Sequence, residues 1–165
     1  MMGARGWYGT AAVLALLLLL HFVLRPFLGE SRAAPDLLLL ALLIYAIGAR
    51  PGRAAVAGFV VGLLADALTP VAFGANAFAH VAVGYLAAWV KAVFFAENLL
   101  VNAGVIFAGT WVRDLLVLIA GRHVGGAAFF WQLGVWSMLK SLTTAAVGVA
   151  VLLVFRRWLA IRVAE

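Results

Sequence analysis

The chain lacks cysteine, and only 11% of its 165 residues are charged. The absence of cysteine excludes disulfides, thiolate catalysis and thiolate metal sites. A soluble domain carries about 25% charged residues and about 45–50% apolar ones, whereas hydrophobic residues make up 67% of this chain. A soluble fold of this size cannot hide so much apolar surface. The composition therefore predicts an all-α integral membrane protein whose solvent is lipid.

Sequence motifs of catalysis are absent as well. There is no G-x-S-x-G serine motif, no Gly-rich phosphate loop and no nucleophile beside a base. The three histidines have no ligand-like spacing. The net charge of +6 would suggest nucleic-acid binding in a soluble protein, but the cations lie mostly between apolar runs, where they set topology and meet lipid headgroups. We expect no enzyme activity, no cofactor, no metal and no nucleic-acid partner.

The apolar runs predict a single transmembrane domain, 1–165, which is a polytopic bundle of about six helices. A membrane-spanning helix needs about 20 apolar residues, with a range of roughly 17–25. The run after Arg5 could open a signal peptide, but it continues through Leu24 without a clear cleavage site, so we expect a retained helix. The predicted helices cover residues 7–24, 35–49, 54–68, 76–95, 99–120 and 129–155.

The second and third segments are short and could form a re-entrant hairpin. Such a hairpin would place Arg50 and Arg53 inside hydrocarbon, at about 2.5–3.5 kcal/mol for each arginine. Two full spans joined by a solvated turn at residues 50–53 avoid this cost, and short helices are tolerated by local thinning of the bilayer. We therefore predict two spans with a tight Arg-Pro-Gly-Arg turn between them.

The distribution of Lys and Arg predicts the orientation. If the N-terminus is cytoplasmic, seven basic residues lie in inner segments and three in outer loops, which satisfies the positive-inside rule. Both termini of this multi-pass protein are then cytoplasmic. The inner residues are Arg5, Arg50, Arg53, Lys91, Arg156, Arg157 and Arg162, and the outer ones are Arg25, Arg32 and Arg122.

With that topology, the polar residues within the helices gather in the outer half of the bundle. Ionisable groups in hydrocarbon are expensive and normally face the protein interior, paired with one another. We expect a structural polar network, and within it a buried ion pair between Asp66 and Lys140, with Asp114 as the rival partner of Lys140. A proton or substrate pathway is the functional alternative. The network residues are Asp66, Asn76, His80, Arg113, Asp114 and Lys140.

Several of these residues, and the residues at the start of the second helix, have simpler explanations. Arg113 and Asp114 are adjacent, so they should point about 100° apart and find separate partners. We interpret His80 as a hydrogen-bonded packing residue and not as a metal ligand. Pro35 and Asp36 suit a helix start, where a carboxylate favours the positive end of the helix dipole.

Small residues recur at every fourth position along the third and fourth segments. Such stripes let helix backbones approach closely, so we expect these two helices to pack together with their polar ends meeting near the outer surface. The glycines predicted at this contact are Gly58, Gly62 and Gly84.

Several short motifs occur in a specific order. The first motif is Pro35-Asp36 with four leucines after it. The second is Gly58-Phe59-x-x-Gly62-Leu63-Leu64-x-Asp66, and the last two are Phe73-Gly74-Ala75-Asn76 and Gly84-Tyr85-Leu86. This order resembles that of the rod shape-determining protein MreD family, over about a third of the chain. From Lys91 onward the sequence departs into generic hydrophobic residues. The resemblance marks Asp36, Gly58, Gly62, Asp66, Gly74 and Asn76 as characteristic positions.

The resemblance implies a non-enzymatic scaffold or regulator of the bacterial cell-elongation (rod) complex in the inner membrane, acting on cell shape and peptidoglycan synthesis. Its direct partner would be an MreC-like bitopic membrane protein, with MreB, RodA and a class B penicillin-binding protein reached indirectly, besides membrane lipids. It also implies a fold similar to the substrate-binding subunits of ECF transporters. The alternative function is accordingly a solute-binding membrane subunit of a vitamin-type transporter.

Overall fold

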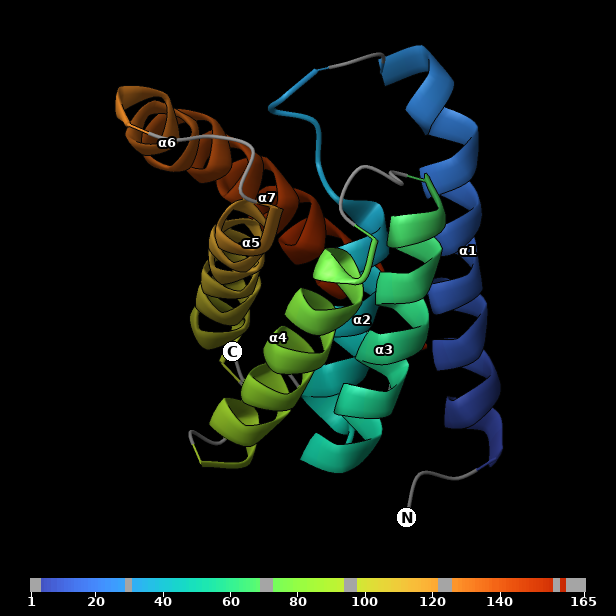
Figure 1. The fold of residues 1–165 in the computed structure, drawn as a ribbon. Coiled ribbons are helices and arrows are strands. Elements are labelled where there is room, and N and C mark those ends of the chain that lie inside the picture. Colours follow the sequence, from blue (N-terminus) through green and yellow to red (C-terminus); the bar gives the residue numbers. More distant parts are fainter. Residues whose placement is uncertain are drawn as a thin grey trace.

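The computed structural model describes residues 4–28, 31–68, 73–93, 98–121, 126–155 and 158–159, and nearly all of them are helical. Figure 1 shows the helices as a bundle, with α1 along one side and α6 projecting from the other. The elements are α1 (Ala4–Leu28), α2 (Leu37–Gly48), α3 (Pro51–Leu68), α4 (Ala75–Val93), α5 (Leu99–Gly121), α6 (Ala127–Trp131), the π-helical turn η2 (Gln132–Trp136) and α7 (Ser137–Val154).

Helix α2 forms the centre of the bundle. It contacts α1, α3, α4, α5 and α7, and Leu39, Leu40 and Leu43 are completely buried. This helix is apolar on every side, as expected for a helix surrounded by others. Large apolar side chains on the outer helices, such as Phe59 and Trp89, are by contrast half exposed.

Three helical stretches among the described residues are long and apolar enough to cross a membrane. They are Pro51–Leu68, Leu99–Gly121 and the continuous run Ala127–Val154, while Tyr8–Leu24 and Leu37–Gly48 are shorter apolar helices. The expectation of an all-helical membrane protein is therefore confirmed.

The structure corrects the predicted helices at several points, and α1 extends beyond the predicted range 7–24 at both ends. The sequence predicts a turn at Pro51 and Gly52, but α3 begins at Pro51, because proline at the first helical position loses no hydrogen bond and has a suitable φ. The last helix is not uniform. Its π-helical turn η2 separates α6 from α7, and within that turn the Leu133 carbonyl accepts a hydrogen bond from the Trp111 indole at 3.3 Å.

Other predicted features lie outside the described residues. These are residues 94–95 at the end of the fourth predicted helix, Arg122 in an outer loop, and the basic residues Arg156, Arg157 and Arg162.

Helices α3 and α4 form an antiparallel seam, as predicted from their small residues. A Cβ atom at Gly58 would overlap the His80 carbonyl, and one at Gly62 would overlap the backbone of Ala77. At the other end of the seam, a Cβ at Gly84 would lie 2.7 Å from the Ala54 carbonyl oxygen. The two backbones are thus in direct contact along their length, which places the C-terminal end of α3 beside the N-terminal end of α4.

Candidate functional site

Four charged side chains form a cluster at one end of the bundle. Lys140 Nζ lies 3.4 Å from Asp36 Oδ2 and 3.2 Å from Asp114 Oδ1. Arg113 Nη2 lies 3.2 Å from Asp36 Oδ2, and its Nη1 lies 2.7 Å from Asp114 Oδ1. Each cation therefore contacts both carboxylates. This ion cluster (Asp36, Arg113, Asp114 and Lys140) joins the start of α2 to α5 and α7.

Asp36 has its position fixed by the local structure around the start of α2. Its Oδ1 accepts the Leu39 N–H at 3.0 Å, which confirms the predicted helix cap. Its own N–H donates to Thr144 Oγ1 on α7 at 3.1 Å, and Thr143 Oγ1 on the same helix donates to the Ala33 carbonyl at 2.7 Å. Capping leaves the other carboxylate oxygen, Oδ2, for both cations.

Arg113 and Asp114 do not find separate partners, contrary to the prediction. Although the side chains of adjacent residues start about 100° apart, the long arginine side chain folds back and reaches its neighbour. Both residues then engage Lys140 or Asp36 as well. Lys140 thus pairs with Asp114, which the sequence indicated only as the rival to Asp66.

Asp66 is engaged elsewhere, so the predicted Asp66–Lys140 ion pair is wrong. Its two oxygens accept the backbone N–H groups of Gly74, Asn76 and Ala77 at 3.0–3.1 Å, and Oδ1 also accepts the Asn76 side-chain amide at 3.1 Å. Unpaired N–H groups at a helix start favour a carboxylate. Asp66 on α3 therefore caps α4, across the turn in which Gly74 adopts a φ of +93°.

His80 lies completely buried on the seam. Its Nδ1 is 2.8 Å from the Asn76 carbonyl oxygen, in agreement with a hydrogen-bonded packing role. Its Nε2 has no hydrogen-bond partner among the described residues. Those residues hold no group of three His, Asp or Glu side chains that could bind a metal ion.

A second buried polar pair lies at the opposite end of the bundle. The Lys91 ammonium on α4 donates to the Asn102 carboxamide on α5, and both residues are buried. The predicted topology counts Lys91 among the inner basic residues, and it does not predict that this side chain is buried against another helix. The sequence signal was Asn102 itself, a polar residue within an apolar run and three positions after the start of α5.

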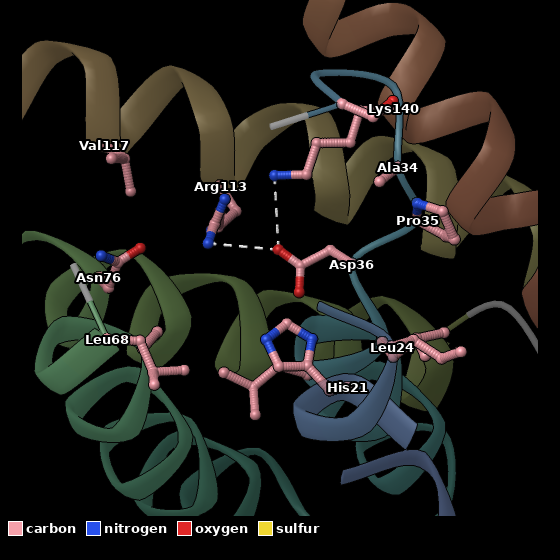
Figure 2. A pocket seen from close by; sticks show the side chains of 14 residues that line it. His21, Leu24, Ala34, Pro35, Asp36, Leu68, Asn76, Arg113, Val117 and Lys140 are labelled. Atoms are coloured by element: carbon pink, nitrogen blue, oxygen red, sulfur yellow. Dashed lines mark ion pairs between the residues drawn. The ribbon is translucent and has the colours of Figure 1, made fainter. Parts of the chain in front are cut away.

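A cavity of about 410 Å³ lies beside the ion cluster. Residues of α1, α2, α3, α4, α5 and α7 line it, together with the connection that precedes α2. Figure 2 shows Arg113 and Lys140 approaching the same oxygen of Asp36 along its wall. The sequence alone indicated neither this cavity nor the role of Thr143 and Thr144, although two adjacent threonines in an apolar helix were a visible signal.

Among the predicted network residues, the structure brings Arg113, Asp114 and Lys140 together and adds Asp36. It places Asp66, Asn76 and His80 in a separate group at the seam. The two groups lie at the same end of the bundle, and the cavity touches both, because Asp36 and Asn76 line it.

Comparison with models of protein families matches residues 7–162 to the model described as rod shape-determining protein MreD. The match extends well past Lys91, where the motif resemblance ended. No curated protein and no solved structure matches.

Proposed function

This chain belongs to the MreD family of rod shape-determining proteins, and from that membership we propose that it is a scaffold subunit of the bacterial cell-elongation (rod) complex. In this role it regulates cell shape and peptidoglycan synthesis by binding an MreC-like bitopic membrane protein. MreB, RodA and a class B penicillin-binding protein are reached through that partner. The observation that carries the proposal is the family match over nearly the whole chain.

The proposed location is the bacterial inner membrane, with six spans and both termini in the cytoplasm. The spans are α1, α2, α3, α4, α5 and the continuous unit from α6 to α7. The excess of basic residues in the segments at one end supports this orientation. The similarity to ECF-transporter substrate-binding subunits, which no solved structure supports, remains part of this proposal. Transport itself has no support from the comparisons.

The proposed contact with the MreC-like protein is made by membrane-embedded helices. A standard interface buries about 800 Å² on each partner, and the connections between the helices are too short to supply that area. The outward faces of α3 and α4 carry half-exposed large side chains, including Phe59, Tyr85 and Trp89. A non-enzymatic role is proposed as well, since the charged groups of the cluster are engaged with one another.

Complementation tests the proposed function. In a rod-shaped bacterium depleted of its own MreD, expression of this chain should restore the length-to-width ratio of the cells. Round cells despite membrane insertion of the chain would contradict the proposal. The interface is tested by co-purification with an MreC truncated to its transmembrane helix and the adjoining periplasmic stretch. Association should persist with that fragment, and it should be lost when the transmembrane helix is replaced by a scrambled apolar one.

A further inference from the structure

The cavity beside the ion cluster is more than a packing defect. Its volume of about 410 Å³ falls within the range of about 300–1,000 Å³ of small-molecule sites. One part of its wall is charged, with Asp36, Arg113 and Lys140, and another part is apolar, with Leu24, Leu68 and Val117. A cavity with these two kinds of wall suits an amphiphile.

Two donors on the charged wall retain hydrogen-bonding capacity. Arg113 uses both terminal nitrogens for Asp36 and Asp114, but its Nε is buried and has no hydrogen-bond partner among the described residues. A buried donor without an acceptor costs about 1–3 kcal/mol. Lys140 has three N–H groups, and its two carboxylate partners account for two of them. Both side chains line the cavity, so a ligand there should present acceptor oxygens.

The charge balance of the cluster restricts the ligand further. Two carboxylates and two cations sum to zero, so an anionic ligand would leave the site with a net negative charge. Net charge in a low-dielectric site is expensive. A zwitterionic ligand adds no net charge to the site. Its cationic group can face the Asp36 carboxylate, which lies on the same wall of the cavity. Phosphate is an acceptor that Arg and Lys bind well.

We propose that this cavity binds the zwitterionic head group of a phospholipid, with its phosphate held by the Arg113 guanidinium and Lys140 and its acyl chains outside the cavity. The apolar wall would meet the glycerol end of the molecule. This site is independent of the rod complex, so its test does not depend on the proposed function.

A cavity-filling variant tests the site without touching a charge. Ala65 is buried on the cavity wall, whereas Ala67 on the same helix is exposed. Ala65→Leu should fill the site, and Ala67→Leu is the matched control. The purified full-length chain in detergent is titrated with phosphatidylethanolamine, phosphatidylglycerol, diacylglycerol or glycerophosphoethanolamine. Thermal melting gives Tm, and native mass spectrometry counts retained lipids.

At a concentration of about 100 times its Kd, phosphatidylethanolamine should raise the Tm of the parent chain and of Ala67→Leu by about 5 °C. One lipid molecule should be retained on each. Ala65→Leu should bind about tenfold more weakly. Arg113→Lys keeps the positive charge but removes the guanidinium with its fork of N–H donors, and it should weaken binding in the same direction. This second variant keeps the test decisive if Ala65→Leu melts early without lipid.

Several results would overturn the assignment. An equal Tm shift with diacylglycerol would show that phosphate is not recognised, and an equal shift with phosphatidylglycerol would remove the preference for a zwitterion. Undiminished phosphatidylethanolamine binding by both Ala65→Leu and Arg113→Lys would place the lipid elsewhere. An equal shift with glycerophosphoethanolamine, which has no acyl chains, would replace the membrane source by a soluble phosphate ester.

Discussion

The ion cluster and the α3–α4 seam join helices by opposite means. In the cluster, long side chains reach across the gaps between α2, α5 and α7, and each charge has two partners. In the seam, the backbones touch at Gly58 and Gly62, where there is no side chain to hold them apart. The stability of the cluster depends on its balance of charges, whereas close packing in the seam depends on the absence of Cβ atoms at the glycines. Substitutions should therefore act on the two regions by different rules.

The largest effect is expected from removing one charge of the cluster. Arg113→Met should lower the free energy of unfolding by about 3–5 kcal/mol, because it leaves excess buried negative charge. Asp36→Asn keeps an oxygen to cap α2, so it removes only the charge. The double variant retains the neutral Asp114–Lys140 pair and should recover much of the loss. Unfolding by SDS titration in mixed micelles measures the coupling.

The same double-variant cycle on Asp66 and Lys140 serves as the control. Because Asp66 accepts hydrogen bonds from the start of α4 and makes no ion pair with Lys140, the Asp66→Asn and Lys140→Met effects should add within about 0.5 kcal/mol. A coupling well above this value would restore the ion pair expected from the sequence.

An intermediate effect is expected at the seam. Gly58→Ala should destabilise by about 1–3 kcal/mol, because the new methyl group meets rigid backbone at His80. Gly104 lies inside α5 with open space where a methyl group would stand, and Gly104→Ala should instead stabilise by up to about 1 kcal/mol. If both variants shifted the unfolding curve in the same direction, close backbone contact would not be the reason for glycine at position 58.

A smaller effect is expected where Asp66 connects the two helices of the seam. Asp66→Asn keeps one acceptor oxygen but removes the charge that faces the α4 N-terminus, so it should cost about 1–2 kcal/mol. Hydrogen exchange of the Gly74 and Ala77 amides should increase in the variant. Unchanged protection of these two amides would contradict the capping role.

The smallest effect is expected at Thr144. Thr144→Val preserves the shape of the side chain but leaves the Asp36 N–H without its acceptor, at about 1 kcal/mol. Ala146→Val, on the exposed side of the same helix, introduces the same side chain without this loss. Comparison of their unfolding curves measures the loss of the two Thr144 hydrogen bonds, from the Asp36 N–H and to the Lys140 carbonyl, and equal curves would assign them no net contribution.

The seam could be predicted from the sequence, but the pairing within the ion cluster could not. A stripe of glycines at every fourth position defines one face of one helix, so local periodicity was enough to assign Gly58, Gly62 and Gly84 correctly. Ion pairing depends on the rotation and depth of several helices at once. The Arg113 side chain is also long enough to contact Asp114, although the two side chains leave the helix in different directions. For the same reason the contact between Lys91 and Asn102 could not be predicted, because it depends on how α4 and α5 are rotated against each other.

Asp36 and Thr144 are 108 positions apart in the chain, and this separation imposes an order on biosynthesis. At about 5–20 residues per second, roughly 5–20 s pass between the synthesis of Asp36 and that of its hydrogen-bond acceptor. Lys140 arrives on the same late segment, and Arg113 arrives only shortly before it. A nascent chain that stops before α7 therefore exposes a carboxylate whose neutralisation is incomplete. Completion of the last helix supplies Lys140 and Thr144, so the cluster can form in full only after α7 has been synthesised.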